Sequence, residues 1–529
     1  MTGPRARNKG PYLMTSSALR CAALAGLMLT GAHGPARADK ASDTFVWATS
    51  GEIGSTDPYY APQAEAIWSS LATCDMLVWK DPRTRENKPL LAESWSWADP
   101  TSLDVTLRKG VRFHNGHPFG PEDVAYTLNQ VSRADSGMGL RVVVDWIDHV
   151  EVTGPDSVRI HAKSPTPMAI DLLSGMVPIY EHGNYDRAPT VASADGRTRR
   201  DFGAVVPSCT GPYKLTQYKP GQGLTLVKNP DYFRDGPKGQ PMIGKIVFRV
   251  IPDTDTQLAE LLTGGIDWMW GVPAENAKQL AAMPDVSVRT GGSVRFSFLT
   301  FDTAQRSGEN PLKDIRVRQA FAYAIDRNAI AANFIGAGAK AVVAMCTPIQ
   351  TACAQDVATT PYDPAKARAL LAEAGYPNGL TLPYYVYRDK PYAEAVVAYL
   401  DKAGIHADMR FMQYPAFAPL SAQGKLAIRQ MSWGSSGILD ASAAVGSFYK
   451  GGVEDYSRDE QVITWLSQAD ATADVAARTA LYRLALNRIN EQALGLPLYS
   501  YGRIYAMSKD FEYPISEDDN NHFYLGRWK

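Results

Sequence analysis

Short alternations of hydrophobic and polar residues dominate residues 43–288. Between residues 103 and 107, leucine and valine alternate with polar residues, which is the period of a strand with one buried face. A second pair of such runs flanks the Gly-Pro-Asp turn at 154–156 and predicts a hairpin. Pro121 begins a helical pattern with acidic residues in its first turn. We therefore expect a strand-rich region with few helices.

From about residue 296 the pattern changes to helices alternating with strands. Residues 314–333 carry apolar side chains at helical spacing, and residues 473–491 form a late amphipathic helix. Residues 363–375 have an Asp-Pro start and a glycine stop, which predict another helix. After Pro497 the strand pattern returns.

These two changes of pattern, near residues 290 and 495, divide the chain. They predict an α/β fold of two lobes, in which the second lobe is inserted into the first. At 529 residues the chain is long enough for each lobe to bury a core of its own.

Residues 1–38 have the parts of a secretory signal peptide. Basic residues without an acidic one precede the apolar stretch 21–32, and a small-x-small site ends at Ala38. The apolar stretch is shorter than the ~20 residues of a membrane helix, so we expect cleavage near Ala38 and a periplasmic protein rather than a membrane anchor. Met14 is an alternative start. No later stretch is apolar over ~18 residues, which predicts a soluble mature protein.

Composition narrows the classes of protein. The chain has 54 Lys+Arg against 55 Asp+Glu and is 45% hydrophobic, which is typical of a globular protein and excludes a disordered one. A nucleic-acid-binding protein would carry a basic excess to neutralise phosphates, so we expect no nucleic-acid partner.

Four cysteines follow the predicted signal peptide: Cys74, Cys209, Cys346 and Cys353. An even number in an exported chain predicts disulfides. Cys346 and Cys353 share a short loop and are the easiest pair, which leaves Cys74 with Cys209, although three pairings are possible. A metal site is the alternative, but no C-x-x-C spacing and no nearby histidine favours it.

Motifs of enzymes are missing or incomplete. The Gly-Ser-Ser-Gly run at 434–437 lacks the spacing of a nucleophile elbow, and the two histidines of 114–117 lie on a glycine turn. The run 239–246 has isoleucine where a phosphate loop needs Ser or Thr. A pair of glycosidase carboxylates stays possible. We expect a binding protein with no cofactor, no metal and no catalytic residue.

One segment, residues 90–128, reads LLAESWSWADPTSLDVTLRKGVRFHNGHPFGPEDVAYTL. It closely resembles the signature region of the family 5 extracytoplasmic solute-binding proteins, which are the dipeptide, oligopeptide and nickel receptors of ABC importers. Further family-like segments occur in the family's order, at 57–58, 210–215, 229–233, 265–267, 314–320, 323–327, 363–367 and 497–499.

The resemblance implies a two-lobed periplasmic binding protein fold with an extra β-rich subdomain in lobe I, which closes on its ligand about a two-crossover hinge. Together with the pattern, it implies lobe I at residues 39–290, lobe II at 291–495 and a C-terminal return to lobe I at 496–529.

The resemblance also implies where a ligand is held. In peptide-binding members, an Asp three residues after a strand-end Trp pairs with the peptide ammonium. Here that Trp is Trp433 and the third residue on is Ser436, so the usual anchor is missing. Either the ligand differs, or Asp440 or another acid holds the amine. Core packing is the alternative role of Trp433.

In dipeptide-binding members, an Arg before Pro-Tyr grips the ligand carboxylate. Arg388 and Lys390 both precede Pro391-Tyr392, and we favour Arg388 because a guanidinium makes two parallel hydrogen bonds to a carboxylate. The alternative is an exposed loop cation.

Aromatic residues of loops that face the cleft in the family add candidates. They are Tyr59, which follows Asp57-Pro58, and Trp270, which shares one strand face with Trp268, so that one of the two tryptophans packs in the core. Nickel-type members use a histidine in the loop after the Trp, and none occurs between Trp433 and Tyr449.

These features together predict a monomeric periplasmic receptor of an ABC importer. It would capture a short peptide or a peptide-like amino-acid derivative and deliver it to an inner-membrane permease. An oligosaccharide or an opine is the alternative ligand, and a secreted hydrolase is the alternative class of protein.

Overall fold

The computed structural model describes residues 40–139, 141–192, 198–335, 338–434 and 438–529. The predicted signal peptide, residues 1–38, and Ser436 lie outside the described residues. Within the described ranges, no helix is long and apolar enough to cross a membrane.

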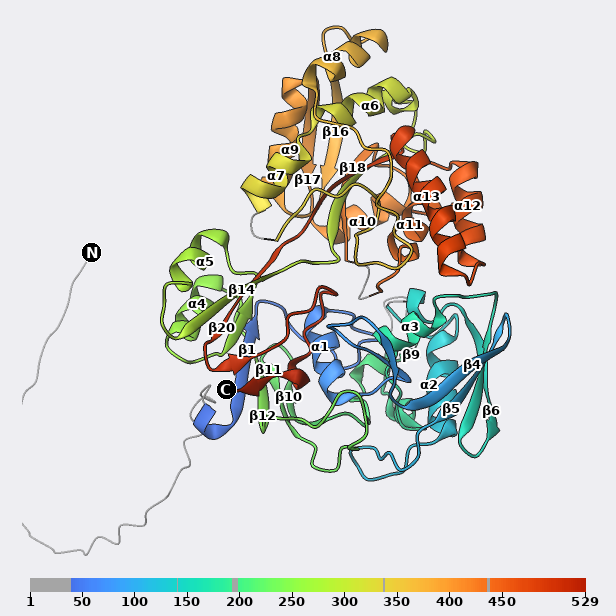
Figure 1. Cartoon of the computed structure of the whole chain (residues 1–529), viewed down its shortest axis with the longest axis vertical. Coiled ribbons are helices and arrows are strands. Elements are labelled where there is room, and N and C mark those ends of the chain that lie inside the picture. Colours follow the sequence, from blue (N-terminus) through green and yellow to red (C-terminus); the bar gives the residue numbers. More distant parts are fainter. Residues whose placement is uncertain (1–39, 140, 193–197, 336–337, 435–437) are drawn as a thin grey trace, which may run out of the picture. The chain divides into compact units, whose positions relative to one another are not determined.

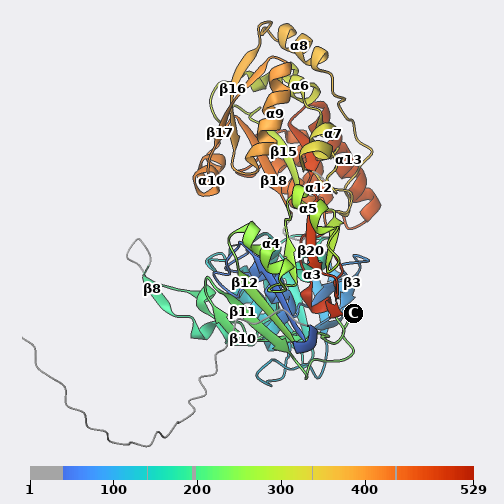
Figure 2. The ribbon, with the colours of Figure 1, turned by 90° about the vertical axis from the view of Figure 1, so that its left-hand side faces the viewer.

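A seven-stranded sheet carries the first and the last parts of the chain (Figures 1 and 2). Its central strand β1 is buried along its whole length and runs parallel to both of its neighbours. In spatial order the strands are β10 (Tyr213–Lys219), β11 (Gly223–Lys228), β12 (Lys245–Val250), β1 (Thr44–Thr49), β13 (Trp268–Trp270), β20 (Arg503–Ser508) and β14 (Val286–Gly291). The helices of this part are α1 (Ala64–Thr73), α4 (Thr254–Leu262) and α5 (Ala274–Leu280).

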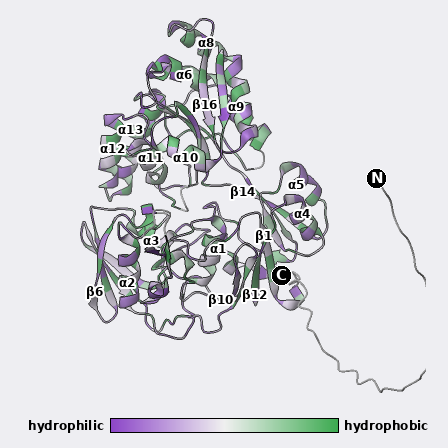
Figure 3. Ribbon diagram, turned by 180° about the vertical axis from the view of Figure 1, so that it is seen from behind, coloured by the Kyte–Doolittle hydropathy of each residue, from purple (hydrophilic) through white to green (hydrophobic). Residues whose placement is uncertain are grey.

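A five-stranded sheet carries the middle of the chain. Its order is β17 (Ile405–Phe411), β16 (Leu380–Val386), β18 (Ile428–Trp433), β15 (Phe296–Phe301) and β19 (Gly495–Ser500). The helices between these strands are α6 (Ile315–Ala324), α7 (Arg327–Ile330), α8 (Pro364–Glu373), α9 (Lys390–Lys402), α10 (Tyr414–Ala422), α11 (Ser442–Tyr449), α12 (Glu460–Asp470) and α13 (Val475–Glu491). Figure 3 shows hydrophilic and hydrophobic residues together along α9, as expected of a helix that buries one side.

A four-stranded antiparallel sheet forms the extra β-rich part, in the order β4 (Ala92–Asp99), β5 (Ser102–Leu107), β7 (Ser157–Ala162) and β6 (Ile147–Gly154). The predicted strand at 103–107 and the predicted hairpin around 154–156 are both confirmed here. Helix α2 (Pro121–Ser132) packs on β6, and α3 (Ala169–Gly175) follows. Short strand pairs complete the fold: β2 (Val78–Lys80) with β3 (Asn87–Pro89), β8 (Thr190–Ala192) with β9 (Thr198–Arg200), and β21 (Phe511–Glu512) with β22 (Arg527–Trp528).

The chain passes twice between the seven-stranded and the five-stranded sheet. It leaves after β14 and returns between β19 and β20, and the two connections meet where the Tyr501 N–H donates to the carbonyl oxygen of Arg295 (2.9 Å). The chain returns to the seven-stranded sheet after residue 500, whereas the pattern placed this change near residue 495. The reason is that β19 still pairs with β15 along residues 495–500. The lobe limits themselves stay a prediction.

The single helix predicted over 314–333 is wrong, whereas the helix start at Asp363 is confirmed. Helix α6 ends before Ile325, whose backbone is extended. A new helix begins after Asp326, because the carboxylate of Asp326 caps it by accepting from the Ala329 N–H (2.9 Å). Asp363 caps α8 in the same way, through the N–H of Lys366 (2.9 Å).

The two cysteine pairs named from the sequence lie at disulfide distance, Cys74 with Cys209 and Cys346 with Cys353. The first pair spans 135 residues and joins the end of α1 to the loop before β10, whereas the second spans 7 residues. A bridge that closes a long loop removes more conformational entropy from the unfolded chain.

We expect loss of the Cys74–Cys209 bridge in a Cys74→Ser/Cys209→Ser variant to lower the free energy of unfolding by about 2–4 kcal/mol. Loss of Cys346–Cys353 should cost less, because its loop is short. Urea denaturation compares the two variants, and non-reducing peptide mapping of periplasmic protein checks the pairing. Free thiols at all four positions would contradict the prediction.

Candidate functional site

A cavity of about 710 Å³ lies where segments of the seven-stranded and five-stranded sheets come together. This volume is typical of small-molecule sites. Its walls come from the start of α1, the end of β13, the connections between the sheets, the loop after β16, helix α10, the end of β18 and residues 518–520.

Aromatic side chains form one wall of this cavity. Trp270 lies at the end of β13 and meets Trp68 of α1 edge-on, with ring centroids 4.7 Å apart. Trp268, on the same strand face, is fully buried in the core and meets Trp47 and Trp68. Of the two tryptophans weighed from the sequence, Trp270 is therefore the one that lines the cavity.

Trp433 ends β18 and also lines the cavity. Its ring packs edge-on against Phe448 of α11 at 5.5 Å, so one part of it packs in the interior. Its indole N–H is buried and has no acceptor among the described residues. A buried donor without an acceptor carries a free-energy cost, which a ligand acceptor would remove.

Arg388 lies in the loop between β16 and α9 and lines the cavity. The next residue, Asp389, has a left-handed backbone (φ 54°), and its carboxylate accepts from the hydroxyl of Tyr501 on the returning connection (2.5 Å). The Arg388 guanidinium donates to the hydroxyl of Ser432, at 3.4 Å. Lys390 does not line the cavity and lies 3.6 Å from Glu394 on the exposed side of α9.

Two further arginines reach the cavity from the connections between the sheets. Arg295 precedes β15, and Arg503 begins β20 and lies over the ring of Trp270 at 4.5 Å. Asp519 lies between them, 3.5 Å from Arg295 and 3.3 Å from Arg503. Burial lowers the pKa of Arg295 more than Asp519 raises it, whereas the pKa of Arg503 is raised by Asp519 despite its burial.

No sequence pattern pointed to Arg295, Arg503 or Asp519. Each is a single charged residue in a connection or a C-terminal loop, without a motif around it. The glycine at position 434 is the one local sequence feature linked to this arrangement, because a Cβ atom there would come within 2.5 Å of the Arg295 guanidinium.

Asp440 and Tyr59, expected as ligand contacts, do not reach this cavity. Asp440 is fully buried, and both of its carboxylate oxygens accept from the guanidinium of Arg478, at 2.5 and 2.7 Å. Tyr59 is fully buried too, and its hydroxyl donates to the carbonyl oxygen of Pro178 (2.8 Å). Both residues lie outside the lining of this cavity, and their expected role as ligand contacts stays a prediction.

The surroundings of Tyr59 form a buried hydrogen-bonded cluster. The carboxylate of Asp57 accepts from the hydroxyls of Tyr180 (2.9 Å) and Tyr185 (2.8 Å) and from the N–H of Tyr59 (3.0 Å). Burial raises the pKa of Asp57 to about 7, although these hydrogen bonds lower it. The cluster holds the loop 54–61 against the β-rich part.

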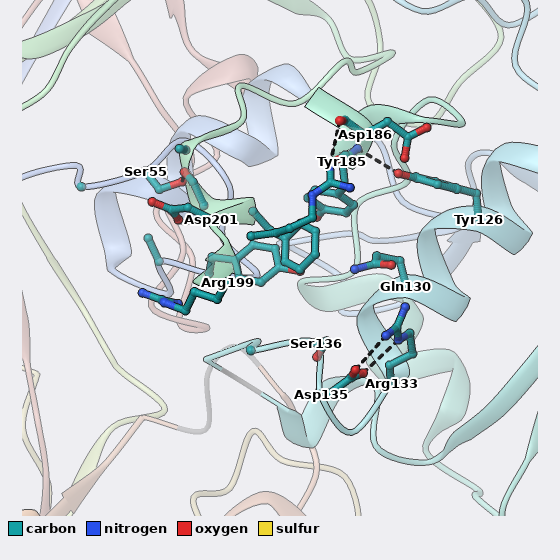
Figure 4. A pocket seen from close by; sticks show the side chains of 18 residues that line it. Ser55, Tyr126, Gln130, Arg133, Asp135, Ser136, Tyr185, Asp186, Arg199 and Asp201 are labelled. Carbon is teal, nitrogen blue, oxygen red and sulfur yellow. Dashed lines mark hydrogen bonds and ion pairs between the residues drawn. The ribbon is translucent and has the colours of Figure 1, made fainter. Parts of the chain in front are cut away.

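A second cavity, of about 860 Å³, lies between the loop 54–61, α2 and residues 199–204 (Figure 4). Two of its three arginines have partners: Arg133 donates to Asp135 (2.9 and 2.7 Å), and Arg200 to the carbonyl oxygens of Tyr185 and Asp186 (2.6 Å each). The third, Arg199, is exposed. Over the described ranges, no cluster of His, Cys, Asp and Glu could hold a metal ion.

Comparison with known proteins places the chain. The model of the bacterial extracellular solute-binding proteins, family 5, matches residues 86–455. The chain belongs to this family. The resemblance read from residues 90–128 is thereby confirmed, and so is the two-lobed α/β fold.

Proteins similar to this chain are named for, or were solved with, different ligands. The chain is 27% identical, over 89% of its length and 91% of the relative, to the glutathione-binding protein GsiB of Salmonella choleraesuis. It is 20% identical to a dipeptide-binding protein of Pseudoalteromonas solved with Met-Leu, with a TM-score of 0.76. That match covers 92% of this chain and 100% of the other. It is 23% identical to the binding protein AgaA of A. tumefaciens solved with agropinic acid, with a TM-score of 0.74 over 92% and 99%.

Proposed function

We propose that this family 5 receptor is periplasmic and binds a short peptide or a peptide-like amino-acid derivative with a free carboxylate. Arg388 carries the proposal, because it lines the cavity and no carboxylate is within ion-pair distance in the described part of the chain. A ligand carboxylate would supply the two hydrogen bonds that a guanidinium prefers. Trp270 and Trp433 would hold the apolar part of the ligand.

The proposal includes delivery. The protein would act as a monomer, close on its ligand about the two connections between the sheets, and dock on the inner-membrane permease of an ABC importer. The glutathione-binding relatives favour a peptide-like ligand, and the AgaA structure keeps an opine as the second candidate. An oligosaccharide fits less well, since a neutral ligand would leave Arg388 without a counterion.

A ligand screen tests this function. Purified protein is heated with di- and tripeptides, glutathione, opines and oligosaccharides, and ligand that it releases is identified by mass spectrometry. A true ligand at 100 times its dissociation constant should add about 2.7 kcal/mol to the free energy of unfolding. Stabilisation by oligosaccharides alone, or chemical turnover of a peptide, would overturn the proposal.

A further inference from the structure

The cavity that holds Arg388 is lined by three arginines and three carboxylates. Its charged lining residues are Arg295, Arg388, Arg503, Glu454, Asp518 and Asp519. The balance among them depends on which acidic groups are already paired with residues outside the cavity.

Two of the three acidic groups are paired in this way. Glu454 accepts from the guanidinium of Arg429, which is fully buried, and from the Ser421 hydroxyl at 2.6 Å. Asp518 is buried, lies 3.2 Å from the imidazole of His522 and accepts from the Asn520 N–H at 2.9 Å. In the described ranges, neither carboxylate lies within ion-pair distance of Arg295, Arg388 or Arg503.

Asp519 is thus the remaining carboxylate for three guanidinium groups. It faces Arg503 through two nitrogen atoms, at 3.4 and 3.3 Å, and accepts from the Ser293 hydroxyl at 2.6 Å. Arg295 is farther away, at 3.5 Å, and its Nε is buried without a hydrogen-bond partner in the described ranges. Asp519 is therefore shared by Arg503 and Arg295, and Arg388 has no carboxylate within ion-pair distance in the described ranges.

We propose that the ligand is a peptide-like dicarboxylate, with one carboxylate bound by Arg388 and the other by Arg295. This inference rests on the proposed function, because it names the class of ligand for the same cavity. In the described ranges three arginines of the cavity have one carboxylate within ion-pair distance, and a ligand with two negative groups compensates the excess of positive charge. A γ-glutamyl peptide, with its free α-carboxylate and its C-terminal carboxylate, and an opine dicarboxylate both have this chemistry.

The packing of Arg295 supports its role. Its guanidinium lies against the backbone of Gly434, directly after Trp433, whose indole N–H also lacks an acceptor in the described ranges. Arg388 and Arg503 also lower the pKa of Arg295, after burial, so a nearby anion would relieve this repulsion.

Calorimetric titration with matched probes tests the inference. One pair is glutathione and its glycine monoethyl ester, and the other is an opine dicarboxylate and its monoamide. Each pair differs in one negative charge, so the neutralised probe should bind at least about 30-fold more weakly, which corresponds to about 2 kcal/mol. The pair that binds more tightly tells a peptide from an opine.

Variants assign the two carboxylates. In Arg295→Gln, the preference for the diacid over a probe neutralised at one carboxylate should fall to about threefold or less. In Arg388→Gln, the preference for the diacid over a probe neutralised at the other carboxylate should fall instead. Arg295→Lys keeps a cation and should keep most of the preference. Arg289→Gln, an exposed arginine of β14 outside the cavity, is the control and should change nothing.

Two results would overturn the inference. If peptides bind and the neutralised probes bind equally well, the dicarboxylate is wrong while the peptide receptor stands. If Arg295→Gln folds, as judged by circular dichroism, and keeps the full preference, Arg295 does not bind the second carboxylate. Failure of every peptide and opine to bind would instead remove the proposed function.

Discussion

Replacement of Arg388 by alanine is expected to weaken ligand binding by about 30-fold to several thousand-fold, which corresponds to about 2–5 kcal/mol. The guanidinium lines the cavity, and its hydrogen-bond partner among the described residues is the Ser432 hydroxyl, at 3.4 Å. In the closed complex, its removal would leave a ligand carboxylate buried without a partner. Titration of the native ligand into Arg388→Ala measures the loss. The fold should survive, because Arg388 is an exposed loop residue.

Lys390→Ala is the matched control, because Lys390 is a cation two residues away that faces Glu394 rather than the cavity. It should bind ligand like the unchanged protein. A large loss in Lys390→Ala and none in Arg388→Ala would show that the lysine holds the carboxylate. If neither variant loses affinity, the ligand is not held by a carboxylate in this loop.

Local patterns predicted much of the fold. The alternation at residues 103–107 is the signal of a strand with one buried face, and these residues form part of β5. The helix predicted over 314–333 failed because apolar spacing continues through Ile325, while the competing cap at Asp326 restarts the helix. Spacing alone does not reveal which of two local hydrogen-bond patterns is the more stable.

The binding site was predicted only in part, because its charges come from segments far apart in the chain. Arg388 and Trp433 carry local family patterns, and both line the cavity. Arg295, Arg503 and Asp519 meet only once the chain has crossed twice between the sheets. An isolated aspartate such as Asp440 gives no sequence signal that tells a ligand anchor from a buried ion pair.

Replacement of Asp440 by alanine is expected to lower the free energy of unfolding by about 3–5 kcal/mol. Arg478 of α13 is nearly fully buried and donates to both carboxylate oxygens. Burial alone would lower the pKa of Arg478, but the hydrogen bonds and charge of Asp440 raise it. Asp440 therefore stabilises the charged form of the buried guanidinium. Without Asp440 a charged group stays buried and unpaired. Urea denaturation of Asp440→Ala measures the loss.

Replacement of both Asp440 and Arg478 distinguishes the effect of an unpaired buried charge from the effect of lost packing. In Asp440→Leu/Arg478→Met no charge remains unpaired, so this double variant should be clearly more stable than Asp440→Ala. Ligand affinity decides whether Asp440 has a second role. Because its carboxylate lies in the interior beside α13, folded Asp440→Ala should bind ligand within about threefold of the unchanged protein, a difference of less than 1 kcal/mol. A large loss of affinity with unchanged stability would instead make Asp440 the anchor of a ligand amine.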